Sequence, residues 1–172
     1  MKNDPEFQYR RPIRLQGYDY SSGDMFFVTI NTKDHVCLFG EIVSGEMYLN
    51  AVGKIVLYEW ERLEFRFPQI QIIAFVIMPN HIHGIILIND GSAEANHGLR
   101  VTSGRGGPTR GSLGVIVGQF KSRVTKRLLS QPDWSKTPVW QRNYYEHIIR
   151  NQDELERIYQ YIQANPINWE EK

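Results

Sequence analysis

The sequence predicts an α+β fold of the ferredoxin-like type: a split βαβ sandwich with an antiparallel sheet, followed by one extra C-terminal helix. Two observations carry this prediction. Segments of strand and helix character follow one another in the order β, α, β, β, α, β, α, and the first six match the ferredoxin-like order. The chain has 172 residues, of which 41% are hydrophobic, so it can fill one core but hardly two.

The predicted elements begin after an N-terminal arm, residues 1–23, whose first part is rich in Arg and Pro. Met25–Asn31 is aromatic and β-branched, which indicates a first strand. A short apolar stretch, Tyr48–Leu57, leads into Tyr58–Phe65, where apolar residues recur every three or four positions as in an amphipathic helix. We expect Pro68 to end this helix.

The middle of the chain predicts two strands, a loop and a second helix. Ile70–Met78 and Ile82–Ile88 are apolar runs on either side of Pro79-Asn80, which indicates two buried, adjacent, antiparallel strands. The glycine-rich stretch Asn89–Gly111 indicates a mobile loop. Val115–Leu129 then shows the apolar spacing of a helix.

The last part of the chain predicts a short strand and the final helix. Tyr144–Ile149 has the composition of the strand. Asn151 or Asp153 caps the helix, and Glu154 in its first turn favours the positive end of the helix dipole. Pro166 ends the helix.

The composition excludes several classes of protein. Cys37 is the only cysteine, so no internal disulfide can form and a reducing compartment is expected. The polar start of the chain contains no signal peptide, and the most apolar window, Ile70–Ile88, is interrupted by polar residues and so is unsuited to a membrane span. We therefore expect a cytoplasmic protein with no membrane partner and one domain over residues 24–172.

The net charge of +1 argues at first against a nucleic-acid partner, but the charges are segregated. The segment between Leu99 and Arg127 holds seven basic residues and no acid. A flexible basic loop followed by a basic helix can follow a phosphate backbone, whereas the alternative is a solvated helix face beside a loop. The candidate DNA-binding residues, which include one arginine further along, are Arg100, Arg105, Arg110, Lys121, Arg123, Lys126, Arg127 and Arg142.

Three aromatic residues near Arg142 extend this basic segment. Trp140, Tyr144 and Tyr145 can stack on unpaired bases, or they can belong to the core. For Trp140 we favour the core.

The first candidate for chemistry is His81-Ile82-His83. Residues i and i+2 of a strand project from the same face, so both imidazoles point one way. Two neutral imidazoles side by side can bind a divalent transition ion. The alternative is a pair of histidines on a half-buried sheet face, although placing two imidazoles beside an aliphatic core is costly.

The second candidate is the final helix. On a helical wheel its core face consists of Leu155, Ile158, Tyr159 and Ile162. Tyr161 lies at the edge of that cluster, and Asn165 shares its side of the helix because the two are four residues apart. Tyr159 and Gln163 have the same spacing and remain a rival pair, which would use a tyrosine from the packing face.

Three motifs of the chain, in their order along the sequence, resemble those of the single-tyrosine HUH transposases. Within that family the chain resembles the branch called REP-associated tyrosine transposases. His81–His83 after Phe75–Asn80 is similar to the His-hydrophobic-His strand of that family. Val139–Arg150 followed by Tyr161–Pro166 resembles the REP-associated branch, and the first strand, Phe26–Ile30, also fits. The likeness covers nearly the whole chain, and the fold of this family is ferredoxin-like.

The resemblance implies a function and a role for each matching residue. His81, His83 and Asn165 would hold a divalent metal, Mg²⁺ or Mn²⁺, and Tyr161 would be the nucleophile. The expected activity is that of an endonuclease and strand transferase for DNA transposition and recombination, which forms a 5′-phosphotyrosine intermediate on single-stranded hairpin or palindromic DNA. Because the third ligand is commonly glutamine in the insertion-sequence branch, the Tyr159 and Gln163 pair stays open. Relatives include dimers, so a homodimer is possible, and the family assigns no role to the loop at 89–111.

Two other functions remain open at this point. The first is a non-catalytic protein that binds nucleic-acid hairpins on the same sheet. The second is a metal-dependent hydrolase in which water attacks and no covalent intermediate forms. The order of His-x-His before Tyr-x-x-x-Asn favours the tyrosine mechanism over both.

Overall fold

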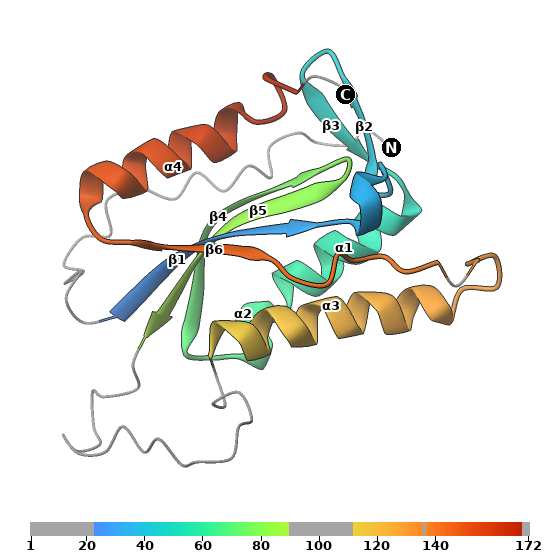
Figure 1. Cartoon of the computed structure of the whole chain (residues 1–172), viewed down its shortest axis with the longest axis horizontal. Helices are drawn as coiled ribbons and strands as arrows, with labels where there is room; N and C mark the ends of the chain where they lie inside the picture. The colour runs from blue at the N-terminus through green and yellow to red at the C-terminus, as the bar shows by residue number, and fades with distance from the viewer. Residues whose placement is uncertain (1–22, 90–111, 136, 170–172) are drawn as a thin grey trace.

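The computed structural model describes residues 23–89, 112–135 and 137–169. Four of its strands form one antiparallel sheet: β1 (Gly23–Asn31), β4 (Ile70–Met78), β5 (His81–Asn89) and β6 (Tyr145–Ile149). Their order across the sheet is β4-β5-β1-β6, so β4 and β5, which the sequence predicted as adjacent strands, do lie side by side (Figure 1). This is the order of a ferredoxin-like sheet, and the predicted fold class is confirmed.

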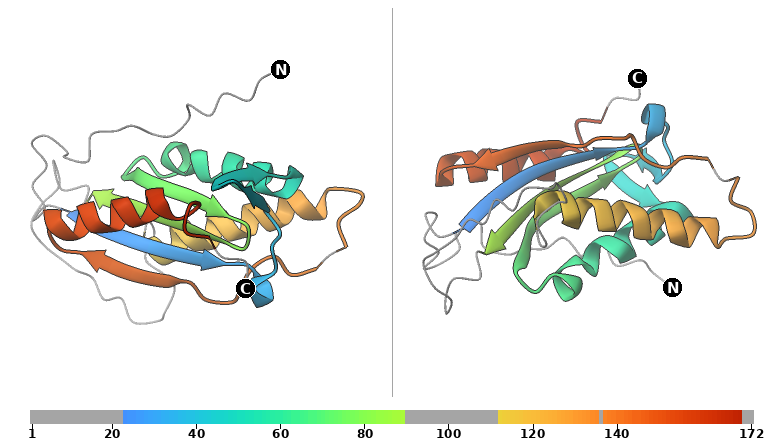
Figure 2. Two further views of the ribbon diagram at one scale, coloured as in Figure 1. Left: turned by 90° about the horizontal axis from the view of Figure 1, so that it is seen from above. Right: turned by 60° about the horizontal axis from the view of Figure 1, so that its bottom comes forward.

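Helices cover the sheet from both sides (Figure 2). On one face lie α1 (Ala51–Glu61) and α3 (Leu113–Leu129), the two crossover helices of the ferredoxin-like unit, while the short α2 (Leu63–Arg66) leads back to β4. On the other face lies α4 (Gln152–Ala164), the extra C-terminal helix. Asn151 caps α4, because its side-chain oxygen accepts a hydrogen bond from the backbone N–H of Glu154 at 2.9 Å.

The segment between β1 and the first helix differs from the sequence prediction. A one-turn 3₁₀ helix, Lys33–His35, is followed by a hairpin of β2 (Gly40–Val43) and β3 (Glu46–Leu49), neither of which the apolar pattern indicated. The helix expected at Tyr58–Phe65 begins instead at Ala51 and ends at Glu61, before the short α2. Its cap is Asn50, whose side chain accepts from Gly53 N at 3.0 Å.

Two glycines in this region are required by close backbone contacts. A Cβ at Gly40, whose φ is +146°, would lie 2.0 Å from the carbonyl oxygen of Tyr48, and a Cβ at Gly53 would lie 2.0 Å from that of Phe39. The start of α1 therefore packs directly on the residue that precedes β2. A contact of this kind depends on the folded chain and has no local signature in the sequence.

The sheet separates two apolar cores. The larger one lies against α1 and α3 and includes Trp60, Phe120, Val28 and Ile82, all fully buried. The smaller one lies against α4, and its buried members are Met25, Ile73, Ala74, Ile85, Leu87, Ile149, Leu155, Tyr159 and Ile162. Because successive residues of a strand alternate between the faces, β1 and β5 contribute to both cores.

Several predictions concern residues outside the described part of the chain. These are the arm over most of residues 1–23 and the loop at 89–111 beyond Asn89, with three of the candidate DNA-binding residues, Arg100, Arg105 and Arg110. The single domain over 24–172 stays a prediction. None of the helices in residues 23–89, 112–135 and 137–169 is both long and apolar enough to cross a membrane.

Candidate active site

The two histidines of the His-x-His motif start β5 and face α4. Thr29 on β1 lies opposite His83 in the strand register, and Val76 on β4 lies opposite it on the other side. The ring centroids of His81 and His83 are 4.5 Å apart, so strand alternation does place both imidazoles together as the sequence indicated. Ile82 between them points into the other core, where it is fully buried.

Tyr161 on α4 reaches this pair. Its hydroxyl oxygen lies 3.2 Å from Nε2 of His83, and the two rings are 5.2 Å apart. The side chain is 52% exposed, so the phenol is open to solvent on its other side. Tyr159, by contrast, is 8% exposed and packs with Leu155 and Ile162 in the smaller core, as the helical wheel predicted.

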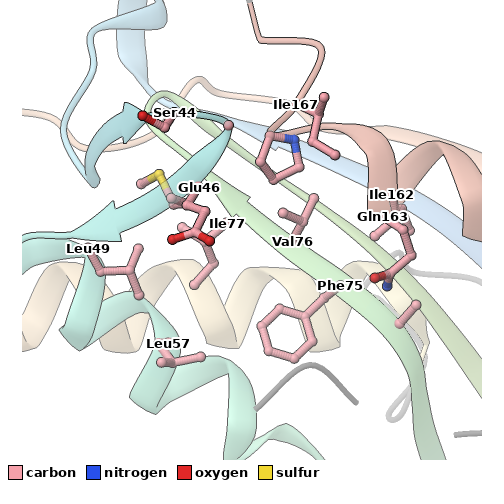
Figure 3. Close-up of a pocket in the computed structure, with 14 residues that line it drawn as sticks. Ser44, Glu46, Leu49, Leu57, Phe75, Val76, Ile77, Ile162, Gln163 and Ile167 are labelled. Carbon is pink, nitrogen blue, oxygen red and sulfur yellow. The ribbon is translucent and has the colours of Figure 1, made fainter. Parts of the chain in front are cut away.

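The residues of the two rival pairs lie in different places. Asn165, which caps the C-terminus of α4, hydrogen-bonds through its side chain to His81, and its Nδ2 donates to the carbonyl of Tyr161 at 3.4 Å. Gln163 instead lines a cavity of about 530 Å³ at the edge of β4, beside Val76 (Figure 3). The structure thus brings Tyr161 and Asn165 to the histidines and leaves Tyr159 in the core.

Burial keeps both imidazoles neutral at physiological pH. It lowers the pKa of His81 to about 4, an effect to which the charge of His35 adds and which the hydrogen bond with Asn165 opposes. It lowers the pKa of His83 to about 3, with a further contribution from His81. Neutral imidazole is the form that binds metals, so the environment keeps both side chains in the form that can act as a ligand.

Neighbouring side chains orient the two rings through their Nδ1 atoms. Nδ1 of His81 lies 2.7 Å from Oδ1 of Asn80, and the Nδ2 of that amide donates to the carbonyl of His35. In the tautomer of His81 that donates from Nδ1 to this oxygen, the lone pair lies on Nε2. Nδ1 of His83 lies 2.9 Å from Oγ1 of Thr29. In the tautomer that donates from this Nδ1, Nε2 of His83 is an acceptor for the hydroxyl of Tyr161.

Three aromatic side chains enclose the site. Phe27 stacks on His83 with centroids 5.3 Å apart and meets Tyr161 edge-on at 6.2 Å. Tyr145 on β6 touches the far edge of Phe27 at 6.3 Å, and Trp169 packs against His81 at 5.9 Å. Of these, sequence reasoning singled out only Tyr145. Phe27 and Thr29 share a strand face at i and i+2, but only the register of β1 against β5 brings them to the histidines.

The described basic residues are spread over several environments. Lys121 is tied to the loop after α3, because its Nζ donates to the carbonyls of Gln141 and Asn143 at 2.8 and 3.0 Å. Arg123 and Arg127 pair with Glu59 of α1, while Lys126 and Arg142 are exposed. Trp140 packs partly buried against the larger core, in line with the preference stated for it.

The candidate donor set suits a weakly held divalent ion. The described ranges contain no group of three or more His, Cys, Asp or Glu that could hold a metal. What the site offers is two neutral imidazoles and the amide of Asn165. Nitrogen ligands of this kind fit Mn²⁺ better than Mg²⁺, which prefers oxygen.

Fold and site together define an α+β protein with a ferredoxin-like sheet, on which an exposed phenol from a C-terminal helix meets the buried His83 beside the half-buried His81. No protein-family model matches the chain. It is 44% identical over 171 residues to an uncharacterized protein of Haemophilus influenzae (strain ATCC 51907 / DSM 11121 / KW20 / Rd), with 95% of this chain and 91% of that protein covered. The chain belongs to the same family as that protein.

Two further proteins are similar to this chain. A protein of the same Haemophilus influenzae strain, provisionally named REP-associated tyrosine transposase, is 24% identical over 149 residues, which cover 87% of this chain and 73% of that protein. The solved structure of a REP-associated tyrosine transposase bound to a REP hairpin superposes with a TM-score of 0.58 at 18% identity, covering 87% of this chain and 70% of that one. The chain therefore shares its fold with that transposase.

Proposed function

We propose that this protein is a DNA endonuclease and strand transferase of the REP-associated tyrosine type, with Tyr161 as its nucleophile. The observation that carries the proposal is the contact between the exposed Tyr161 hydroxyl and Nε2 of the buried, neutral His83 at 3.2 Å. The fold shared with a transposase bound to a REP hairpin supports a DNA hairpin as the substrate. Cytoplasmic location and a possible homodimer stay predictions.

In the proposed reaction the phenolic oxygen of Tyr161 attacks a backbone phosphate of single-stranded DNA. A bond forms between this oxygen and phosphorus, and the bond from phosphorus to the 3′ oxygen breaks. The products are a 5′-phosphotyrosine and a free 3′-hydroxyl, which takes up one proton while the phenol gives one up. Attack of a 3′-hydroxyl on the phosphotyrosine reverses the step, so strands can be rejoined without an energy cofactor.

The surrounding residues prepare Tyr161 for this attack. Nε2 of His83 lies at hydrogen-bond distance from the Tyr161 hydroxyl, so it can accept that hydrogen bond and orient the phenolic oxygen. Phe27 packs edge-on against the phenol and flat on His83, which limits the movement of both rings. The exposed side of the phenol leaves room for a phosphate to approach.

His81, His83 and Asn165 are the residues that would hold a divalent ion. When bound there, Mn²⁺ or Mg²⁺ would supply Lewis-acid polarisation of the scissile phosphate. Nε2 of His83 cannot accept a hydrogen bond from the phenol and serve as a metal ligand at the same moment. Tyr161 must therefore release its hydrogen bond to His83 before that nitrogen can act as a ligand.

A covalent-adduct assay tests the proposal. Labelled single-stranded hairpin DNA is incubated with the protein and Mg²⁺ or Mn²⁺, and denaturing gels are examined for a protein–DNA adduct. We expect Tyr161→Phe to abolish the adduct and Tyr159→Phe to retain it. The reverse pattern would assign the nucleophile to the rival pair, and cleavage without any adduct would indicate attack by water. Hairpin binding with neither cleavage nor adduct would indicate a non-catalytic binding protein.

A further inference from the structure

The outer surface of α1, α2 and α3 carries three exposed arginines, Arg62, Arg123 and Arg127, beside Arg66, whose side chain is only 12% exposed. We call these four residues the helical-side cluster. These helices lie on the face of the sheet opposite α4, and so opposite the candidate active site (Figures 1 and 2). Only Arg123 and Arg127 belong to the basic segment noted in the sequence. Arg62 and Arg66 come from the other side of the α1–α3 contact.

A buried carboxylate organises this cluster. The side chain of Glu59 on α1 is 1% exposed, and it pairs with Arg66 of α2 and with Arg127 and Arg123 of α3, the last at 3.4 Å. Burial alone would raise the pKa of the Glu59 carboxyl. The hydrogen bond from Arg127 and the charges of the three arginines outweigh that effect and hold the pKa below its usual value.

One carboxylate cannot occupy all the donors of three guanidinium groups, since each carries five N–H bonds. The side chains of Arg123 and Arg127 remain about half exposed although they are paired. Glu59 therefore fixes their inner edges and leaves outer N–H groups directed at solvent. Side chains ordered in this way lose less conformational entropy when a ligand binds.

Tyr58 orders the cluster from outside. The guanidinium carbon of Arg127 lies 4.3 Å from the centroid of the Tyr58 ring, and that of Arg62 lies 5.4 Å from it. Arg62 also lies 5.3 Å from the ring of Phe65, which is 77% exposed. Because two guanidinium groups already contact it, Tyr58 is better placed to hold the arginines than to stack on a base.

The surface is strongly positive in balance. Helices α1 and α2 contain three acids, of which Glu59 is paired and Glu64 is turned inward, where its carboxylate accepts from the N–H of Ile72 at 2.7 Å. The third, Glu61, is exposed, and α3 contains no acid at all. Four arginines thus face one buried and one exposed carboxylate.

We propose that the helical-side cluster is a preorganised binding site for nucleic-acid backbone phosphates, which holds the DNA hairpin on the face of the molecule away from Tyr161. Guanidinium groups match phosphate oxygens in charge and geometry. The identity of the ligand as DNA rests on the proposed function. The site itself follows from the ordered arginines and their charge.

Salt-dependent binding of a labelled hairpin, measured by fluorescence anisotropy in the presence of a chelator, tests this site without cleavage. For the double variant Arg62→Ala/Arg123→Ala we expect affinity to fall about 10-fold or more, and the slope of log K against log salt to lose about 1.8, or 0.9 for each phosphate contact. Arg62 stacks only on exposed rings and Arg123 is the most distant partner of Glu59, so the core pairs remain.

Arg157→Ala is the matched control, because Arg157 is an exposed arginine on α4, on the opposite side of the sheet. It should leave affinity and slope unchanged. Equal losses in the control and the double variant, or unchanged affinity in both, would overturn the site. Lost affinity in the double variant, with no adduct ever formed by the native protein, would refute the proposed cleavage and leave the site supported.

The variant Glu59→Gln tests whether DNA binding depends on the ordering of the arginines by Glu59 or only on the positive charge of the surface. The substitution raises the net charge by one, so a surface that merely collects positive charge would bind DNA more tightly. A site that depends on the carboxylate to hold its arginines should bind several-fold more weakly. Tighter binding by Glu59→Gln would overturn the ordering role, and thermal unfolding of the variant checks that it folds.

Discussion

The two faces of the sheet are built from the same strands but filled differently. Against α1 and α3, large side chains such as Trp60 and Phe120 are sealed completely from solvent. Against α4 the apolar cover reaches only part of the sheet, and beyond it the buried His83 and the half-buried His81 meet the exposed Tyr161. The face against α1 and α3 is closed by apolar packing. The face against α4 leaves room for two histidines whose pKa values are lowered by burial.

The largest expected effect contrasts one aromatic residue from each face. Trp60→Ala should cost about 3–5 kcal/mol of unfolding free energy, because it removes a fully buried ring from the larger core. Tyr161→Phe removes a hydroxyl from a half-exposed side chain together with its hydrogen bond to His83, and should cost about 1 kcal/mol. Urea unfolding of both variants measures the difference. Similar midpoints for the two would contradict the division between the faces.

The second prediction concerns the stability of the protein at low pH, to which the two histidines on the α4 side of the sheet should contribute. Because burial lowers the pKa of His81 and His83 to about 4 and about 3, the unfolded chain binds more protons than the folded one below the ordinary histidine value of 6.5. Stability should therefore be unaffected above about pH 7 and fall as the pH drops toward 4, by on the order of a few kcal/mol.

The double variant His81→Gln/His83→Gln provides the comparison for this acid effect. It should lose less stability than the native protein between pH 7 and pH 4, in urea titrations at each pH. Parallel curves for the two proteins would show that other groups cause the loss.

The sequence predicts those features of the two faces that depend on residues close together in the chain. The apolar runs of β4 and β5, the Asn151 cap and the inward position of Tyr159 follow from neighbouring residues, and the structure agrees with each. The β2–β3 hairpin was missed because its strands are only four residues long. The early start of α1 was missed because a glycine there, Gly53, is typical of a turn. In the structure it allows a close contact with the backbone of Phe39.

In the candidate site, too, the sequence predicts the features that are close together in the chain and misses those that depend on distant contacts. Two histidines on one face and a Tyr–Asn pair on one helix are periodic features, so sequence alone could find them. Thr29 and Phe27 join them only through strand pairing across 54 residues or more. Likewise, the basic segment was visible as a run of charge, but its pairing with Glu59, 68 residues from Arg127, was not.

The third prediction compares two glycines on the side of the sheet that α1 and α3 cover. A Cβ at Gly84 would lie 2.5 Å from Cζ2 of Trp60, so Gly84→Ala should cost about 1–3 kcal/mol through overpacking. Gly118 in α3 is exposed and has no atom within 4 Å of its Cβ position, so Gly118→Ala should stabilise the protein by about 0.5–1 kcal/mol. Thermal unfolding should move the two melting temperatures in opposite directions. A shift of the same sign in both would mean that Trp60 yields easily.

The last prediction concerns Thr29, which orients His83 on the α4 side of the sheet. Thr29→Val keeps the shape of the side chain but removes the oxygen that lies 2.9 Å from Nδ1 of His83, at a cost of about 1 kcal/mol. Without that partner the ring is no longer held in the tautomer that presents Nε2 to Tyr161, so adduct formation should slow about 10-fold. Thr125→Val is the control, since Thr125 donates a hydrogen bond of similar length to the carbonyl of Lys121 within α3. It should cost comparable stability and leave the adduct rate unchanged, whereas equal rates in the two variants would show that Thr29 supports the fold but not the reaction.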